Sequence, residues 1–277
     1  MTNLSTDNGC QTLGQGIPTN GCAVEEEGNF YNEKFYKSIV SGSLRSAEIV
    51  LKTVFEVLPK INSAVDFGCG TGTWLSVLTK LGVNEIKGFD GSWAKNELLI
   101  PQECFTAVNF DKEIIKVEKK YDLAISLEVA EHIPEQMART FVKTITNASD
   151  IVLFSAAIPY QGGTNHINEQ WQNYWRTIFV ECGYVGTDFI RSTILNAQDV
   201  EMWYKQNIVL YVRKEKMGTV SIPEQCFMNE QLDFVHPELY LTRVKHLKTL
   251  NVKEMPLLKL YRLMLKRTIK KMLGIDK

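Results

Sequence analysis

The sequence predicts an α/β protein with a doubly wound, mostly parallel seven-stranded sheet and a helical C-terminal extension. Three observations predict this fold class. Short apolar runs alternate with helix-length segments, a glycine-rich turn follows the first run, and the last two runs are close enough in sequence to allow an antiparallel final strand. With 277 residues, the chain can bury a core without metal or disulfide support.

The composition excludes several classes of protein. Hydrophobic residues make up 44% and charged residues 23%, which is ordinary for a globular enzyme. No stretch approaches the roughly 18 uninterrupted apolar residues of a membrane span. The six cysteines are scattered without metal-site spacing, which favours reduced thiols, and the first residues lack the pattern of a secretory signal. We therefore expect a cytoplasmic protein.

The chain divides into three predicted parts. Residues 1–28 are rich in Asn, Thr, Gly and Gln and predict a flexible N-terminal arm. Residues 29–214 form the main domain, and residues 215–277 form a basic, largely helical extension. Within the main domain, apolar residues recur at helical spacing from Ser43 until Pro59, which predicts an amphipathic helix that leads into the sheet.

The predicted strands follow in order. Five apolar runs separated by helix-length segments are residues 63–67, 85–89, 105–110, 121–126 and 150–155. After a helix suggested over residues 168–182, two more runs cover residues 185–190 and 207–212. Right-handed crossovers between such strands place helices on both faces of the sheet.

A glycine-rich turn, GCGTG at residues 68–72, joins the first strand to a helix that starts near Thr73. Glycines allow the backbone to turn tightly and to approach a ligand beyond the strand. A dinucleotide loop requires G-x-G-x-x-G/A, but Thr73 occupies its last glycine position, so the spacing favours S-adenosylmethionine (SAM). Asp90, 22 residues after Gly68, is placed to bind ribose hydroxyls. The alternative is a tight turn without a ligand.

Two segments carry a family resemblance. VDFGCGTG at residues 65–72 and YDLAISLEVAEHIP at residues 121–134 resemble class I SAM-dependent methyltransferases, particularly the small-molecule and sugar methyltransferases near the ubiquinone O-methyltransferase branch. The resemblance spans about residues 29–213. It implies a Rossmann-like fold, SAM as cofactor and methyl transfer as the activity.

The resemblance also implies which residues bind the cofactor. The candidates are the loop residues Asp66, Gly68, Cys69 and Gly70, the ribose acid Asp90, and Leu127 beside the adenine. Asn109 stands where the family more often has an aspartate near the adenine amino group, and Asp111 is an alternative contact. Arg45 resembles an arginine that reaches the SAM carboxylate, but a surface charge on a helix explains it equally well.

We expect methyl transfer to a hydroxyl, which needs a base to take the proton. His166 is the first candidate and His132 the second, because both follow strands whose carboxyl ends converge. The segment 155–171 is dense in hydrogen-bonding side chains, and we assign acceptor binding to Tyr160, Gln161, Asn165 and Glu169. Such a loop suits a sugar, glycan or small metabolite. Alternatively, Asn165 and Glu169 build a turn and a helix start, and we expect the nearby tryptophans to pack in the core.

In the ubiquinone branch, an E-x-x-E-H grouping matches Glu128, Glu131 and His132, and the resemblance implies a divalent metal there. Carboxylates near the positive end of a helix explain the same residues. We expect no metal ligands.

The tail from Arg243 to Lys277 has eleven Lys/Arg against Glu254 and Asp276, a charge of +9, which leaves −10 on residues 1–242. Leu257, Tyr261 and Leu265 recur at helical spacing, so the tail predicts a cationic amphipathic helix that contacts an anionic inner membrane surface. Packing on its own domain or on a second copy in an oligomer is equally consistent. No groove-reading motif supports a specific nucleic-acid partner. A catalytically silent SAM- or nucleotide-binding module and a methyltransferase acting on a non-sugar small molecule are the alternative functions.

Overall fold

The structure is a computed structural model that describes residues 33–112, 115–227 and 230–249, together with residues 257, 261, 262, 264 and 265. The strands are β1 (Ser63–Phe67), β2 (Glu85–Asp90), β3 (Phe105–Ala107), β4 (Leu123–Leu127), β5 (Ile151–Ser155), β6 (Tyr184–Thr187) and β7 (Val209–Arg213). The helices are α1 (Glu33–Val57), α2 (Thr73–Lys80), α3 (Ala138–Ala148), α4 (Gln172–Glu181), α5 (Phe189–Ile194), α6 (Met202–Asn207) and α7 (Pro237–Thr249). Short 3-10 turns are η2 (Ser92–Glu97), η3 (Gln102–Cys104), η4 (Ala130–His132), η5 (Glu135–Met137), η6 (Lys214–Thr219) and η7 (Glu224–Phe227).

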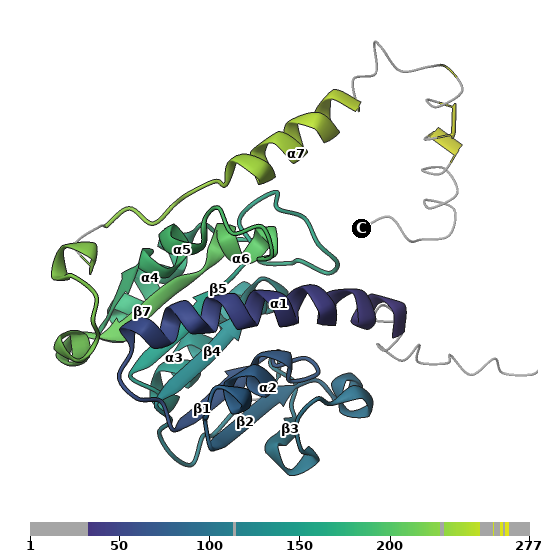
Figure 1. Cartoon of the computed structure of the whole chain (residues 1–277). Helices are drawn as coiled ribbons and strands as arrows, with labels where there is room; N and C mark the ends of the chain where they lie inside the picture. Colours follow the sequence, from purple (N-terminus) through teal and green to yellow (C-terminus); the bar gives the residue numbers. More distant parts are fainter. Residues whose placement is uncertain are drawn as a thin grey trace, which may run out of the picture.

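The seven strands form one sheet in the order β3-β2-β1-β4-β5-β7-β6 (Figure 1). Strands β1 to β5 pair in parallel, whereas β7 runs antiparallel to both β5 and β6. Chain order reverses at β1, which lies between β2 and β4, so the loops after these strands leave the sheet beside one another. In an open α/β sheet this reversal point is where ligands bind. The predicted fold class and the antiparallel final strand are confirmed.

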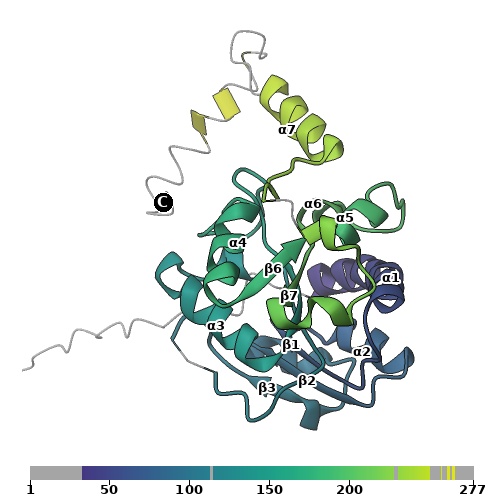
Figure 2. The ribbon, with the colours of Figure 1, turned by 90° about the vertical axis from the view of Figure 1, so that its left-hand side faces the viewer.

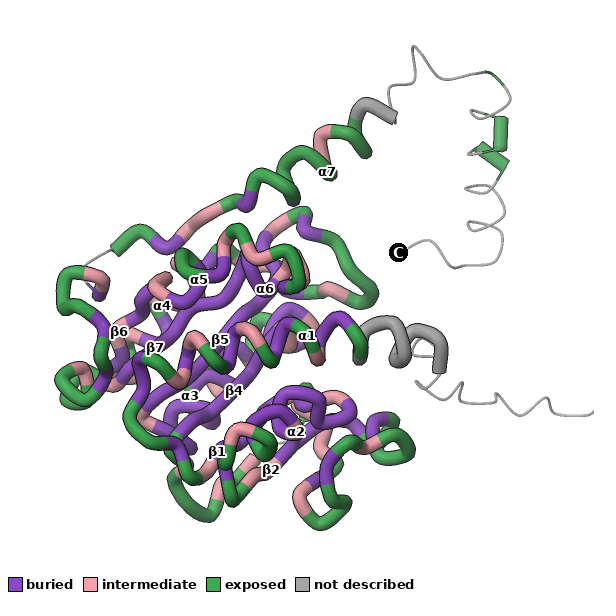
Figure 3. The backbone as a smooth tube through the Cα atoms, in the orientation of Figure 1, coloured by how far each residue is buried: buried purple, intermediate pink, exposed green. Residues whose placement is uncertain are grey.

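Helices cover both faces of the sheet, as the two views in Figures 1 and 2 show. Helices α1, α2, α5 and α6 pack on one face, and α3 and α4 pack on the other. Strand residues alternate between the two cores because successive side chains point to opposite faces: Leu123 and Ile125 join the first core, and Ala124 joins the second. Figure 3 shows the central strands buried, whereas α7 is mostly exposed.

Three predicted elements differ in detail from the structure. The helix before the sheet begins at Glu33, ten residues before the expected Ser43. The strand expected over 185–190 ends at Thr187, because the backbone of Asp188 caps helix α5 by accepting the amide of Ser192 at 2.8 Å. The run expected over 207–212 contains the end of α6 at Asn207, and two short helices separate β6 from β7.

The C-terminal extension is described in part. Helix α7 confirms helical structure over Pro237–Thr249, and Leu257, Tyr261 and Leu265 are helical and exposed. The predicted N-terminal arm, and the rest of the predicted tail helix, lie outside the described residues. No described helix has the length and apolarity needed to cross a membrane. The four described cysteines, Cys69, Cys104, Cys182 and Cys226, are free thiols.

Candidate active site

The glycine loop ends β1 and starts α2 at the carboxyl edge of the sheet. The backbone amides of Gly68 and Cys69 both donate to the carbonyl of Phe89 on β2, at 2.7 and 3.1 Å. Gly72 has a φ of +82° and is the N-cap of α2, so the turn into the helix uses a left-handed residue. The loop is thereby tied to the end of the neighbouring strand.

Two glycines of this loop are required for different reasons. A Cβ at Gly68 would lie 2.2 Å from a methyl group of Val129, so the residue that follows β4 packs directly on the backbone there. A Cβ at Gly70 would meet no described atom within 4 Å, and its φ is +54°. Gly70 therefore leaves open space above a bare backbone, the arrangement that a ligand approaching the loop needs.

Asp90, at the end of β2, faces the glycine loop. Its Oδ2 accepts the amide of Gly70 at 2.6 Å, and its Oδ1 accepts the amide of Gly91 at 2.6 Å. Burial raises the pKa of Asp90 to about 6 despite these two hydrogen bonds. The pKa of Asp66, which is also buried, is raised well above its ordinary value by burial and then by the charge of Asp90. Two buried carboxyls thus border the loop, and they suit hydroxyl or ammonium donors from a ligand.

The remaining cofactor candidates are placed as follows. The Sγ of Cys69 packs against Gly88 of β2 and Leu127 ends β4 in the core. The Oδ1 of Asn109 accepts the amide of Asp111 at 3.0 Å, so it caps its own turn after β3. Arg45 is exposed on α1 and has no ion pair with another described residue. Their contacts to the cofactor stay predictions.

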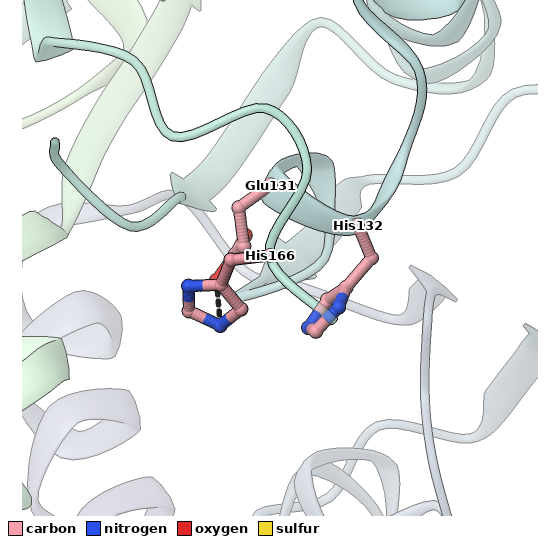
Figure 4. Close-up of side chains that lie close together, drawn as sticks. All are labelled: Glu131, His132 and His166. Atoms are coloured by element: carbon pink, nitrogen blue, oxygen red, sulfur yellow. Dashed lines mark ion pairs between the residues drawn. The ribbon is translucent and has the colours of Figure 1, made fainter. Parts of the chain in front are cut away.

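Beyond β4 and β5, two histidines and a glutamate converge (Figure 4). Glu131 and His132 come from η4, and His166 comes from the loop after β5. The imidazole rings lie 4.9 Å apart, and the Nε2 of His166 lies 4.0 Å from Oε1 of Glu131. One ligand atom from each of the three residues lies within 4.8 Å of the others. Both predicted catalytic histidines therefore meet in one place.

The surrounding groups fix the tautomer of each ring. The Nδ1 of His166 lies 2.9 Å from Oε1 of Glu169, and the Nδ1 of His132 lies 3.2 Å from the carbonyl of Asn165. A carbonyl or a carboxylate oxygen can only accept, so both Nδ1 atoms carry the hydrogen. Burial, followed by the charge of His166, lowers the pKa of His132. With the hydrogen on Nδ1, Nε2 is the ring atom that can accept a proton or bind a cation.

Glu131 is the most unusual member of this cluster. It is fully buried, and its carboxyl faces the backbone amides of Glu131 and Ala157 and the carboxyl of Glu128, with no charged donor at hydrogen-bond distance among the described residues. Its pKa is raised well above the ordinary value, first by burial and then by the charge of Glu128. A buried carboxyl without a cationic partner is costly unless a proton or a bound cation compensates it. The donor set of one carboxylate and two imidazoles, each oriented by a further acceptor, fits a first-row divalent ion.

Glu128 lies beside Glu131 and is held by a partly buried polar network. Its carboxylate accepts the side-chain amide of Asn207 at 3.0 and 3.2 Å and that of Gln161 at 3.0 Å. The Oε1 of Gln161 also accepts from Asn207 at 2.9 Å, which closes the network. Burial raises the pKa of Glu128 to about 7. The network links the loop after β4, the loop after β5 and the end of α6.

Backbone strain is concentrated at the same place. Within the described residues, the non-glycine residues with positive φ are Glu128, Tyr160 and Asn165, at +57°, +66° and +58°. Such conformations persist where the surroundings hold them, and they cluster at functional sites. Glu169 stabilises this loop because it accepts the amides of Tyr160 and Gly162, at 2.7 and 2.9 Å, as well as pairing with His166.

The predicted acceptor residues divide into exposed and buried ones. Tyr160 is 87% exposed and Asn165 is exposed, whereas Gln161 is buried inside the polar network. Trp175 is buried as expected, but Trp171 is 42% exposed, so the core expectation is wrong for that residue. Asn207 was not among the predicted site residues, because it stood at the start of the last predicted strand. A polar residue directly before an apolar run was the available signal.

The geometry defines a Rossmann-like protein with a nucleoside-type cofactor loop on one side of the reversal point and a histidine-carboxylate cluster on the other. A protein-family model described as a methyltransferase domain matches residues 44–177. Residues 44–177 therefore form a methyltransferase domain of the class I SAM-dependent type, and SAM is the cofactor of this domain.

Solved structures with the same fold are distant in sequence. A chain of the complex between the Haloferax volcanii Trm112 methyltransferase activator and a methyltransferase is 14% identical, with a TM-score of 0.50; the match covers 69% of this chain and 99% of that one. Magnesium protoporphyrin IX methyltransferase from Synechocystis PCC 6803 with bound SAM is 19% identical, with a TM-score of 0.45 and coverage of 64% and 82%. An O-methyltransferase family protein from Burkholderia thailandensis is 12% identical, with a TM-score of 0.46 and coverage of 65% and 58%. No curated protein matches the chain in sequence.

Proposed function

We propose that this methyltransferase transfers the methyl group of SAM to a hydroxyl of a sugar, a glycan or another small metabolite. The observation that supports the proposal is the convergence of Glu131, His132 and His166 beside the cofactor loop. Val129, three residues before His132, packs on Gly68, so the cluster and the loop are neighbours across the reversal point. Both histidines carry the hydrogen on Nδ1, so Nε2 is suited to accept a proton from a hydroxyl.

In this reaction the acceptor oxygen forms a bond to the methyl carbon as the bond from carbon to sulfur breaks. The chain must align the acceptor with the methyl group and exclude water. His166 takes the hydroxyl proton on Nε2, and Glu169 stabilises the imidazolium through Nδ1 at 2.9 Å. S-adenosylhomocysteine (SAH) and the methyl ether are the products. The buried Gln161 and Asn207 hold Glu128 beneath the acceptor loop.

The same cluster fits a divalent cation, which Glu131, His132 and His166 would hold. Such an ion would lower the pKa of an acceptor hydroxyl and compensate the buried charge of Glu131. Glu169 and the carbonyl of Asn165 orient the two imidazoles for either role. We therefore include metal-assisted O-methylation in the proposal.

The test is transfer of a labelled methyl group from SAM to a panel of nucleotide sugars, glycans and phenols. We run it with the chain as isolated, after chelation, and after addition of magnesium, manganese or zinc. Transfer to a hydroxyl supports the proposal, and loss on chelation with recovery on metal addition assigns the cation role. Tight SAH binding without transfer to any acceptor would instead indicate a catalytically silent module.

We further propose that the basic tail brings the enzyme to an anionic membrane surface on the cytoplasmic side. Leu257, Tyr261 and Leu265 are 83%, 63% and 47% exposed. Together with the tail charge of +9, these apolar side chains suit the boundary between lipid headgroups and acyl chains. Deletion of residues 255–277 is expected to abolish flotation with liposomes that contain phosphatidylglycerol. Unchanged flotation would remove the membrane partner from the proposal.

A further inference from the structure

The C-terminal extension is fastened to the methyltransferase domain just before α7. The side-chain amides of Gln172 and Gln206 both donate to the carbonyl of Phe234, and the amide of His236 donates back to Gln206. Arg191 donates to the carbonyl of Leu232 at 3.1 Å. Because these hydrogen bonds are buried or part-buried, the start of α7 has a defined position relative to α4 and α6.

Helix α7 brings Arg243 onto the acceptor loop. A Cβ at Gly162 would lie 2.8 Å from a terminal nitrogen of Arg243, and a Cβ at the next residue, Gly163, would lie 2.1 Å from Nε2 of His166. The two consecutive glycines therefore seat a guanidinium and the proposed catalytic imidazole against adjacent stretches of backbone. A side chain at either position would displace one of the two.

The guanidinium of Arg243 has no ion pair or hydrogen bond within the part of the chain that the structure describes. Its Nε is buried and lacks a partner. The carboxylates at hand are engaged elsewhere: Glu169 binds two backbone amides and His166, and Glu238 pairs with Lys205 at 3.3 Å. By contrast, Arg139, Arg191 and Arg213 each pair with an acidic residue.

We propose that Arg243 is a specificity-determining residue that binds an anionic group, a phosphate or a carboxylate, on the acceptor. The inference deepens the proposed function and rests on it. A guanidinium presents paired donors that match such oxyanions, and the basic tail provides a favourable field for an anionic molecule. Tyr160 and Trp171, both exposed on the loop after β5, add aromatic surface to the same loop. The acceptor is therefore an anionic sugar or glycan.

The test measures binding to the full chain saturated with SAH, by calorimetry, with glucose, glucose 1-phosphate and glucuronate as probes. We expect one of the two anionic probes to bind at least about tenfold more tightly than glucose. Arg243→Met retains the length of the side chain and is expected to remove that advantage, whereas Arg243→Lys retains part of it. Lys245→Met, on an exposed residue of the same helix, is the control for loss of one positive charge and is expected to retain the advantage.

Equal binding of all three probes to the unaltered chain would overturn the proposal, and so would an advantage that survives in Arg243→Met. SAH affinity, measured on each variant, shows that the fold is intact. A chain that prefers the anionic probe but methylates no hydroxyl would contradict the proposed function and leave the role of Arg243 standing. Methyl transfer to a hydroxyl without any preference for the anionic probes would support the proposed function and contradict the role of Arg243.

Discussion

The two sides of the reversal point are built by different means. On the cofactor side, the glycine loop and its two bordering carboxyls, Asp66 and Asp90, lie within residues 65–91. On the acceptor side, side chains make the site, and they come from η4, the loop after β5, the end of α6 and helix α7. Proteins that bind the same cofactor need the same backbone shape at the cofactor loop. Proteins that act on different acceptors need different side chains at the acceptor site.

The two sides also differ in how much backbone strain and how many buried carboxyls they contain. The cofactor loop needs left-handed glycines, which carry little steric strain there. The acceptor side keeps three non-glycine residues at positive φ, buries Glu131 and leaves Glu128 half-buried. Residues with a side chain cost on the order of 1–3 kcal/mol each in such a conformation. Changes on the acceptor side should therefore alter the reaction, and changes on the cofactor side should alter binding and folding.

The largest effect is expected for His166→Ala. Loss of the proton acceptor lowers kcat by about 10²–10⁴ because no other described ring pairs with Glu169. SAH affinity should stay within about twofold, since the ring contacts the acceptor side. Transfer of labelled methyl and SAH calorimetry measure the two quantities. Full activity in this variant would remove His166 from the reaction.

The next effect is expected for Gly68→Ala. The new Cβ would lie 2.2 Å from Val129, and the residue would be left-handed with a φ of +86°. Strain and overpacking together should cost about 2–5 kcal/mol of unfolding free energy and weaken SAH binding. Gly82→Ala is the matched control: its φ is +93° and no described atom lies within 4 Å, so only the strain of about 1–2 kcal/mol applies. Equal losses in urea unfolding would contradict the packing argument.

Asp90→Asn tests the cofactor side through the pH dependence of the unfolding free energy. Burial raises the pKa of Asp90 to about 6 from an ordinary value of 3.8, so the fold disfavours the charged form. Protonated Asp90 stabilises the fold at a pH below the pKa that it has in the unfolded chain, and this stability is lost as the pH rises through 6. An asparagine at this position does not ionise, so the variant does not lose stability in this way. Relative to the unaltered chain, the variant should gain about 2–3 kcal/mol between about pH 4 and about pH 7, while SAM affinity falls. A pH-independent difference in urea unfolding would contradict this assignment.

Glu169→Gln should have the smallest effect. The amide can still accept the proton of His166 through its oxygen, but it cannot stabilise the imidazolium by charge. We expect kcat to fall about tenfold with the KM for SAM unchanged. Glu169→Gln loses the acceptor of the Tyr160 amide, whereas Glu169→Ala loses the acceptors of Tyr160, Gly162 and His166 together and should fall further. Equal activity in both variants would show that Glu169 does not position the ring.

The strands and the glycine loop could be predicted from the sequence. Contacts between side chains that lie far apart in the sequence could not. Strands β1, β2 and β5 agree with their apolar runs to within one residue, and Asp90 lies against the glycine loop as its spacing indicated. Phe189 and Ile190 were assigned to a strand because a short apolar run fits a buried helix equally well. The contact between Asn207 and Glu128 joins positions 79 residues apart, and no periodicity reports such a contact.

Gln206 and Asn207 are consecutive residues that serve two parts of the protein. Gln206 fastens the C-terminal extension through Phe234 and His236, and Asn207 holds Glu128 under the acceptor loop. A change in the segment that holds Phe234 and His236 would therefore also disturb the position of Glu128. During evolutionary divergence, we expect the C-terminal extension and the acceptor to change together, while the cofactor side stays the same.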